Sequence, residues 1–405
     1  MKDVQEIKKD FPMLQHYPLI NYLDNAATSL KPQSVLDKMN EYYTQYGVNV
    51  HRGAYQLAHV ASYEFDTARE KIANFIHADP DEIILTKGAS ESLNEAHLFL
   101  CDQLRPGDEI VCNYLEHHSA ILPWLHWSFH HTNPIRYVLL DSQCRLNPQE
   151  LEKTITPQSK ILVVTMVSNV LGFVTNVKEC AKIAHQHNMI VIVDATQAVQ
   201  HVPIDVRDLD CDFLAFSGHK MLGPSGVGVL YGKKSILNRC TPVYWGGGMM
   251  EDVDLHHIVL KGAPHKFEVG TPMMAEVIGL GAAIDYIQAL GFDWIQQHDA
   301  KLVAYLKQQL SLLQGITIYN IDMDLPIVAF NINGVHPHDA ASFYDEARIL
   351  LRAGHHCAQL LTQHLGCENG TLRASFYIYN DFEDVDRFIE VTNQIIQFFG
   401  GALDE

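Results

Sequence analysis

The sequence lacks several features that would assign it to common classes of protein. Its 29 Lys and Arg are outnumbered by 48 Asp and Glu, which gives a formal net charge of −19 over 405 residues. Proteins that bind the nucleic-acid backbone neutralise its phosphates with Lys and Arg, so no nucleic-acid partner is expected. No uncharged apolar run is long enough to span a bilayer, and Met1 to Glu6 place charges where a signal peptide needs apolar residues. We therefore expect a soluble, cytoplasmic protein with no membrane partner.

Closely spaced cysteines and polar low-complexity tracts are also missing. The eight cysteines are scattered, at 101, 112, 144, 180, 211, 240, 357 and 367, and none forms a CxxC pair. A disulfide framework would be dense and a zinc site clustered, so thiols in a reducing compartment are expected. His126 and His130 have helical i, i+4 spacing, but no Cys or carboxylate stands close by to complete a metal site. The sequence predicts an ordered globular protein without a metal.

Short apolar runs alternate with helical patterns over the middle of the chain. The runs cover residues 82–86, 109–112, 161–165, 189–193, 213–216 and 227–231. Continuous apolar runs of this length suit strands buried on both faces, so we predict an α/β fold with a mostly parallel sheet wrapped by helices. Ligands of such sheets bind beyond the carboxyl ends of the strands.

The C-terminal part follows another pattern, and the chain is longer than one hydrophobic core usually serves. Beyond His265 we predict helices at 300–314, 338–347 and 382–399 and strands at 327–332 and 372–379. We therefore expect two domains. The large one would span residues 20–290, and a small α+β domain would combine residues 1–19 and 291–405.

A lysine and an aspartate follow two of the predicted strands. Lys220, in Ser217-Gly218-His219-Lys220, can hold an aldehyde cofactor as a Schiff base if its surroundings lower its pKa. Asp194 ends another strand, and a carboxylate there can pair with a protonated pyridine nitrogen. The plain alternatives are a surface lysine on a loop and an aspartate that caps the next helix.

Three further strand ends carry polar groups. Gly88 and Ser90 stand between a strand and a helix, where free backbone N–H groups and a hydroxyl can bind a phosphate, or simply cap the helix. His117 could stack on a flat ring and relay protons, and Asn169 could hydrogen-bond a ring oxygen. Each signal is weak alone, but five strand ends with such groups together predict a cofactor site.

The order of these residues resembles the fold-type I pyridoxal-phosphate (PLP) enzymes of the class V aminotransferase family. The resemblance runs from Tyr22-Leu23-Asp24-Asn25-Ala26-Ala27-Thr28 to Leu372-Arg373-Ala374-Ser375-Phe376. Within the family, Arg352-Ala353-Gly354-His355-His356-Cys357-Ala358 resembles the catalytic-cysteine loop of group II cysteine desulfurases, of the SufS and CsdA type. The segments His117-His118, Asn49-Val50-His51-Arg52-Gly53 and Phe267-Glu268-Val269-Gly270-Thr271-Pro272 agree with this. The resemblance implies the PLP-dependent transferase fold type I.

The resemblance also implies a role for each matching residue. Lys220 would be the Schiff-base lysine, Asp194 would pair with the pyridine nitrogen and His117 would stack on the ring. Asn169 and Gln197 would contact the ring hydroxyl. The phosphate would be held by the backbone of Ala89, by Ser90, Ser217 and His219, and by Thr271 from the other subunit of a homodimer.

The implied substrate is L-cysteine, and Cys357, Lys220 and His117 would be the catalytic residues. Cys357 as thiolate would take the substrate sulfur as a persulfide and release L-alanine. Arg373 would pair with the substrate carboxylate, for which a planar guanidinium is suited, although it could instead be a structural strand-end arginine. Further candidates for substrate binding are Arg352, Asn169, His51 and Arg52.

The implied function is a cysteine desulfurase that supplies sulfur for iron–sulfur cluster assembly through a small acceptor protein of the SufE, CsdE or SufU kind. Three positions depart from the family pattern. Ala89 stands where many relatives have threonine, Ser119-Ala120 replaces Ala-Asn, and Leu360 replaces a proline. These departures put the rate and the loop detail in question, and not the reaction class.

Four alternatives stay open. A selenocysteine lyase on the same scaffold would act on L-selenocysteine and need Cys357 less. An aminotransferase would need a keto-acid acceptor and would leave Cys357 without a role. The plain alternative for Cys357 itself is a buried structural thiol, as expected for the other seven cysteines. A sulfur-relay scaffold or a metal-binding protein would have no cofactor on Lys220.

Overall fold

The computed structural model describes residues 3–50 and 53–403, with side chains through residue 399. Its centre is a seven-stranded sheet in the order β2-β8-β7-β6-β5-β3-β4, in which only β8 runs against the others. The strands are β2 (Ile83–Thr86), β3 (Glu109–Asn113), β4 (Ile135–Val138), β5 (Ser159–Thr165), β6 (Ile190–Asp194), β7 (Phe213–Ser217) and β8 (Gly228–Gly232). The predicted mostly parallel sheet is confirmed, with the half-exposed strand β4 added to it.

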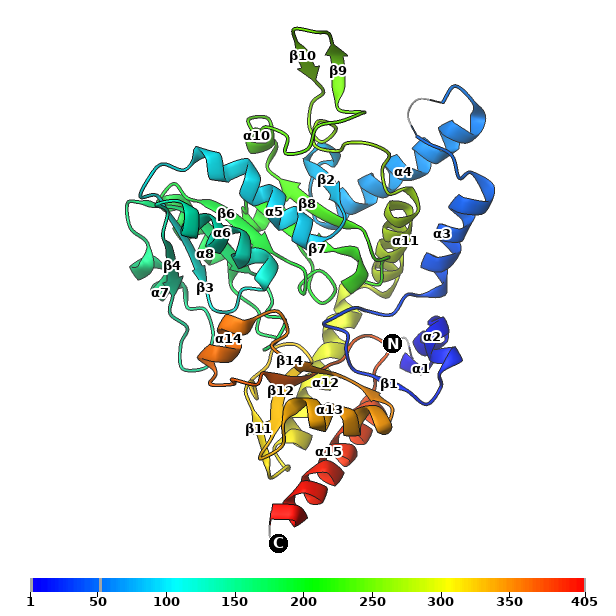
Figure 1. Cartoon of the computed structure of the whole chain (residues 1–405). Coiled ribbons are helices and arrows are strands. Elements are labelled where there is room, and N and C mark those ends of the chain that lie inside the picture. Colours follow the sequence, from blue (N-terminus) through cyan, green and yellow to red (C-terminus); the bar gives the residue numbers. More distant parts are fainter. Residues whose placement is uncertain (1–2, 51–52, 404–405) are drawn as a thin grey trace.

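The sheet is buried on both faces because successive side chains of its strands enter two different cores. On β5, Ile161 and Val163 join one apolar cluster while Leu162 and Val164 join the other. Helices cover both faces (Figure 1). The elements around the sheet are η1 (Pro80–Glu82), η2 (Cys101–Gln103), η3 (Gly218–Lys220), α3 (Gln33–Gln45), α4 (Gln56–Phe75), α5 (Ala89–Leu100), α6 (His118–His130), α7 (Pro148–Thr154), α8 (Val177–Gln186), α9 (Val206–Leu209), α10 (Lys234–Leu237) and α11 (Met274–Leu290).

A second, antiparallel sheet with the order β11-β12-β15-β14 lies below the first in Figure 1. Its strands are β11 (Ile316–Ile318), β12 (Ile327–Ile332), β14 (Arg352–Gly354) and β15 (Thr371–Ser375). The helices of this part are α12 (Phe292–Leu310), α13 (Pro337–Glu346), α14 (Gln359–His364) and α15 (Phe382–Leu403). An apolar cluster that includes Leu306, Phe330 and Phe388 fills its interior. The exact domain limits at residues 19 and 290 stay a prediction.

The N-terminal segment connects the two parts. After α1 (Val4–Lys9) and α2 (Pro12–His16), strand β1 (Asn21–Tyr22) pairs in parallel with β13 (Ile349–Leu350). The chain then runs beside β15, where the Ser375 N–H donates to the Leu23 carbonyl at 2.7 Å. It continues to α3, which packs against α11 of the large part (Figure 1).

Besides the added strand β4, the end of β15, helix α11 and one hairpin differ from the sequence-based expectations. The last strand was expected to reach Tyr379 but ends at Ser375, because Tyr377 to Tyr379 leave the sheet and are buried in the larger core instead. Helix α11 and the hairpin of β9 (Met250–Val253) and β10 (Ile258–Leu260) were not predicted. In the described part of the chain no helix could cross a bilayer by itself; α11 and α12 meet the length and hydropathy criteria only as a pair bent by 74°.

Candidate active site

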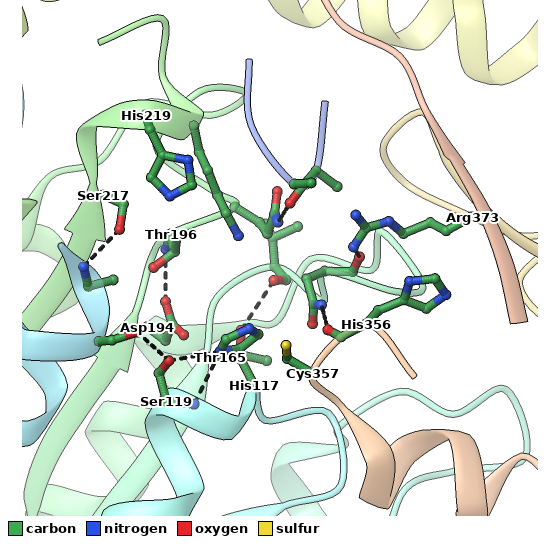
Figure 2. Close-up of a pocket in the computed structure, with 18 of the residues that line it drawn as sticks. His117, Ser119, Thr165, Asp194, Thr196, Ser217, His219, His356, Cys357 and Arg373 are labelled. Atoms are coloured by element: carbon green, nitrogen blue, oxygen red, sulfur yellow. Dashed lines mark hydrogen bonds between the residues drawn. The ribbon is translucent and has the colours of Figure 1, made fainter. Parts of the chain in front are cut away.

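A cavity of about 210 Å³ lies at the carboxyl ends of the parallel strands, where it meets the second sheet (Figure 2). It brings together twelve of the residues singled out from the sequence. They are Ala89, Ser90, His117, Asn169, Asp194, Gln197, Ser217, His219, Lys220, Arg352, Cys357 and Arg373. Thr271 lines separate cavities of this chain, and His51 and Arg52 lie outside the described residues.

One end of the cavity is suited to an anion. Gly88 has a φ of +156° before the first turn of α5, and a side chain at Gly228 would collide with the Gly88 backbone at 2.4 Å. The Ala89 N–H donates to Ser217 Oγ at 2.7 Å, and Ser90 Oγ lies 2.6 Å from Ser119 Oγ. Hydroxyls and N–H groups gathered at a helix start can bind a phosphate.

Lys220 and Asp194 lie deeper in the cavity. Lys220 belongs to the short turn after β7, and burial, followed by the charge of Arg373, lowers its pKa to about 8. The lowered pKa gives Lys220 a larger share of neutral, nucleophilic amine near physiological pH than an ordinary lysine has. Asp194 ends β6 and accepts a hydrogen bond from the Thr196 N–H at 3.0 Å. Among the residues that the structure describes, the buried Thr196 Oγ1 has no hydrogen-bond partner.

His117 caps α6, and its Nδ1 accepts the Ser119 N–H at 3.1 Å. Burial, followed by the charge of Lys220, lowers the pKa of His117 to about 4, so the imidazole is neutral at pH 7. The preceding residue, Glu116, is buried and accepts hydrogen bonds from Asn113 Nδ2 at 2.7 Å and from the Thr165 N–H at 2.9 Å. Glu116 thus fixes the turn that presents the His117 ring to the cavity.

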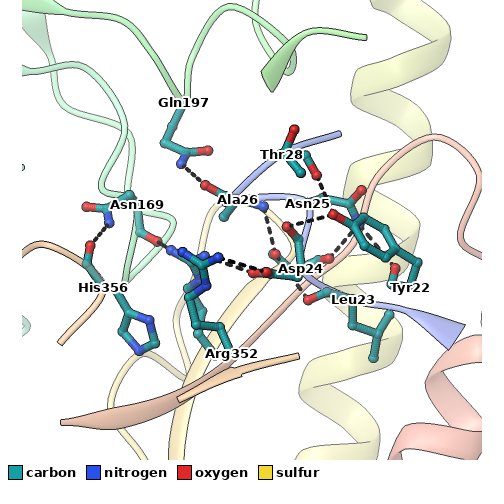
Figure 3. Close-up of polar contacts among 12 residues, drawn as sticks. Tyr22, Leu23, Asp24, Asn25, Ala26, Thr28, Asn169, Gln197, Arg352 and His356 are labelled. Carbon is teal, nitrogen blue, oxygen red and sulfur yellow. Dashed lines mark hydrogen bonds and ion pairs between the residues drawn. The ribbon is translucent and has the colours of Figure 1, made fainter. Parts of the chain in front are cut away.

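Two arginines enter the cavity from neighbouring strands of the second sheet. Arg352 on β14 stands directly opposite Arg373 on β15. Arg373 is buried and donates to the Asn169 carbonyl at 2.9 Å, and both arginines pair with the carboxylate of Asp24. Figure 3 shows Arg352 beside Asp24. Guanidinium groups in this position can bind a ligand carboxylate.

Cys357 lies on the loop between β14 and α14 and is the one exposed cysteine of the eight. His356 and Cys357 have φ angles of +52° and +55°, a left-handed conformation that side chains disfavour. Hydrogen bonds from the large part hold this conformation: Asn169 Nδ2 donates to the His356 carbonyl, and the His118 N–H donates to the Cys357 carbonyl, both at 2.7 Å. The thiol faces the cavity between His117 and Arg373 (Figure 2).

Three contributors to the site escaped the sequence analysis. Ser119 was noted only as a departure from a pattern, although it contacts both Ser90 and His117. His118 accepts the Gln359 N–H through Nε2 at 3.1 Å, and Asp24 pairs with the arginines. Their proximity depends on tertiary contacts, and the short motifs that contain them carry no signal for it.

The residues present fit an aldehyde cofactor with a phosphate group. A lysine with a lowered pKa, a carboxylate at the next strand end, an uncharged imidazole and an anion site line one cavity. The buried Thr196 hydroxyl, which has no partner among the described residues, remains for a further hydrogen bond. Within the described residues, no group of three or more His, Cys, Asp or Glu side chains is arranged to hold a metal ion.

The model of the class V aminotransferase family matches residues 21–388. The chain is 45% identical over 404 residues to a probable cysteine desulfurase of Halalkalibacterium halodurans, covering 98% of this chain and 99% of that protein. A probable cysteine desulfurase of Staphylococcus aureus is 41% identical, with 98% of both proteins covered.

Two solved structures are similar over 98% of this chain and 99% of their own. The cysteine desulfurase of Thermococcus onnurineus, in its apo form, superposes with a TM-score of 0.94 at 38% identity. The cysteine desulfurase CsdA of Escherichia coli superposes with a TM-score of 0.92 at 36% identity. The chain belongs to the class V aminotransferase family and has its PLP-dependent fold type I.

Proposed function

We propose that this protein is a cysteine desulfurase, which converts L-cysteine to L-alanine and keeps the sulfur on Cys357 as a persulfide. The observation that carries the proposal is the placement of the exposed Cys357 thiol in the same cavity as Lys220 and Arg373. Two relatives that this chain matches over nearly their full length are named cysteine desulfurases, which supports the proposal. An aminotransferase would have no use for a thiol at this position.

The cofactor in the proposal is PLP. Lys220 would hold its aldehyde carbon, Asp194 its ring nitrogen, and the α5 start with Ser90 and Ser217 its phosphate. When bound, PLP supplies an electron sink that weakens bonds at the α and β carbons of an amino acid. Because burial lowers its pKa to about 8, Nζ of Lys220 can both take up and release a proton near that pH.

Cys357 would form the new S–S bond. Its thiolate attacks the substrate sulfur, the substrate C–S bond breaks, and its electron pair stays on carbon, which takes up a proton to become the methyl group of alanine. Arg373, fixed by burial and by the Asn169 carbonyl, would hold the substrate carboxylate while this occurs.

The exposure of Cys357 also supports a protein acceptor for the persulfide. The proposal locates the enzyme in the cytoplasm, where a small acceptor protein of the SufE, CsdE or SufU kind would take the persulfide sulfur for iron–sulfur clusters.

The proposal also includes a homodimer. It is supported by the β9–β10 hairpin, which projects from the molecule (Figure 1) and has Leu255 at its tip, 95% exposed. Thr271 would then serve the partner's cofactor.

The test is alanine and sulfide release from cysteine by the PLP-loaded protein, with and without a reductant. Cys357→Ala should abolish both products, whereas Cys367→Ala, a buried thiol ten residues later, should retain them. Full cysteine turnover by Cys357→Ala would refute the mechanism. If that variant keeps turnover of selenocysteine alone, selenocysteine would be a second substrate that does not need the thiol.

A further inference from the structure

The segment Tyr22 to Thr28 matched the family in sequence, yet the proposed reaction gives Asp24 no role. Its backbone is rigidly held. Asp24 forms an isolated parallel bridge with Ser375, and its carbonyl accepts the Ala27 N–H at 3.0 Å. The next residues are also fixed, since the Ala26 N–H donates to Ser375 Oγ at 2.8 Å. The Asp24 side chain therefore starts from a well-defined point beside β15.

The carboxylate of Asp24 bridges two cations. Its Oδ1 lies 3.1 Å from Arg373 Nη2, and its Oδ2 lies 3.3 Å from Arg352 Nη2 (Figure 3). Arg352 and Arg373 face each other as a direct cross-strand pair. Like charges in that position repel, so the two guanidiniums need an anion between them to stay side by side.

The two arginines differ in their freedom to move. The Arg373 side chain is 2% exposed and also donates to the Asn169 carbonyl. The Arg352 side chain is 49% exposed, and Asp24 is the ion-pair partner found for it among the described residues. Without Asp24, Arg373 would keep its place, whereas Arg352 would turn into solvent, away from the repulsion.

The charges of this cluster do not balance by themselves. Two guanidiniums meet one carboxylate, so one positive charge remains, on a wall of the cavity that also carries Cys357. One further carboxylate would complete the set. This count fits an amino acid with a single free carboxylate in this part of the cavity.

We propose that Asp24 is a positioning residue for the substrate carboxylate, which holds Arg352 and Arg373 together as a two-guanidinium receptor with one net positive charge. The proposal rests on the proposed function, in which Arg373 binds that carboxylate. It adds that Arg352 takes part in the receptor only while Asp24 holds it there.

The experiment measures binding of L-alanine, the product, to the PLP-loaded protein by titration of the cofactor's absorption band. L-Alaninamide, which lacks the carboxylate, is the second probe. We expect Asp24→Asn and Arg352→Ala each to weaken L-alanine binding about tenfold, the scale of one charge-assisted hydrogen bond. The double variant Asp24→Asn/Arg352→Ala should lose no more than either single variant, because each single variant already removes the contact between Arg352 and the L-alanine carboxylate.

Two controls separate charge from structure. Asp24→Glu restores the anion and should bind L-alanine within about threefold of the unchanged protein, in line with retention of most of the ion-pair energy. Asp324→Asn removes a similar ion pair, 2.7 Å from Arg145, outside the cavity, and should leave binding unchanged.

The possible failures are distinguishable. If Arg373→Ala binds L-alanine normally, the proposed carboxylate site is wrong, and the inference falls with it. If Arg373→Ala weakens binding but Asp24→Asn leaves it unchanged or tightens it, the role of Asp24 is refuted while the site stands. Equal losses for L-alanine and L-alaninamide in Asp24→Asn would show a structural effect and also refute the inference.

Discussion

The loop that carries Cys357 depends on His118, and substitution of this histidine should loosen it. The imidazole Nε2 accepts the Gln359 N–H at 3.1 Å, and the His118 backbone N–H donates to the Cys357 carbonyl. The loop needs such contacts because His356 and Cys357 are both in the left-handed conformation, which costs roughly 1–2 kcal/mol for each residue.

His118→Ala removes the side-chain acceptor and leaves the backbone contact in place. One neutral hydrogen bond contributes about 1 kcal/mol net, so the open state of the loop should become about fivefold more populated. Hydrogen exchange of the amides in residues 355–361, measured by mass spectrometry, should accelerate by that factor. His118→Gln places an amide oxygen where Nε2 lies and should restore the slow exchange. His126→Ala, at an exposed position on the same helix, is the control.

The same contact should depend on pH. Burial, followed by the charge of His355, lowers the pKa of His118 below 6.5, so the ring is neutral and able to accept at pH 7. The pKa of His118 is lowered only in the closed loop. The contribution of His118 to the stability of the closed loop is therefore fully present above pH 6.5 and is lost as the pH falls through the lowered pKa. In His118→Gln, the protection of these amides relative to an unfolded peptide at the same pH should not fall in this way. The reasoning is wrong if His118→Ala exchanges like the unchanged protein, or if His118→Gln exchanges as fast as His118→Ala.

Three other predictions follow from burial, exposure and charge. Lys220 reacts as the neutral amine and its pKa is about 8, so PLP uptake by the cofactor-free protein, followed by absorbance, should accelerate as the pH rises through 8; a flat profile from pH 7 to 9 would contradict this. Leu255→Asp places a charge at the exposed tip of the hairpin and should convert the proposed dimer to monomers in light scattering; a dimer that persists unchanged would argue against this interface. Glu116→Ala leaves the buried Asn113 amide and Thr165 N–H without an acceptor, so urea unfolding should show a loss of roughly 1–3 kcal/mol for each group, whereas Glu116→Gln should lose much less; equal losses in both variants would refute the hydrogen-bond argument.

Most strands of the large sheet could be predicted from the sequence because a strand buried on both faces is a continuous apolar run. The residues at their carboxyl ends could be assigned to one site because parallel strands end at one edge. The half-exposed strand β4 and the exposed hairpin of β9 and β10 leave no such trace and were missed.

The end of β15 and the partners of Asp24 could not be predicted for a different reason. Residues Tyr377 to Tyr379 have the apolar character typical of a buried strand. They leave the sheet because they pack into the larger core, a tertiary contact that their own sequence does not indicate. The pairing of Asp24 with Arg373 joins residues 349 positions apart, and nothing local to either indicates it. The predicted roles of the site residues, of Thr271 in a second subunit and of His51 and Arg52 stay predictions.

The threading of the N-terminal segment between the two parts has a consequence for synthesis. Strand β1 pairs with β13, and Leu23, Asp24 and Ala26 are held by residues of β15 near the end of the chain. A ribosome-bound chain therefore cannot complete the cavity wall until residue 375 has left the exit tunnel, even though the strands that carry Lys220 and Asp194 are made much earlier. A nascent chain that captures the cofactor early would hold it in a site without the wall from the second sheet, and only the finished protein would bring the exposed Cys357 thiol to that site.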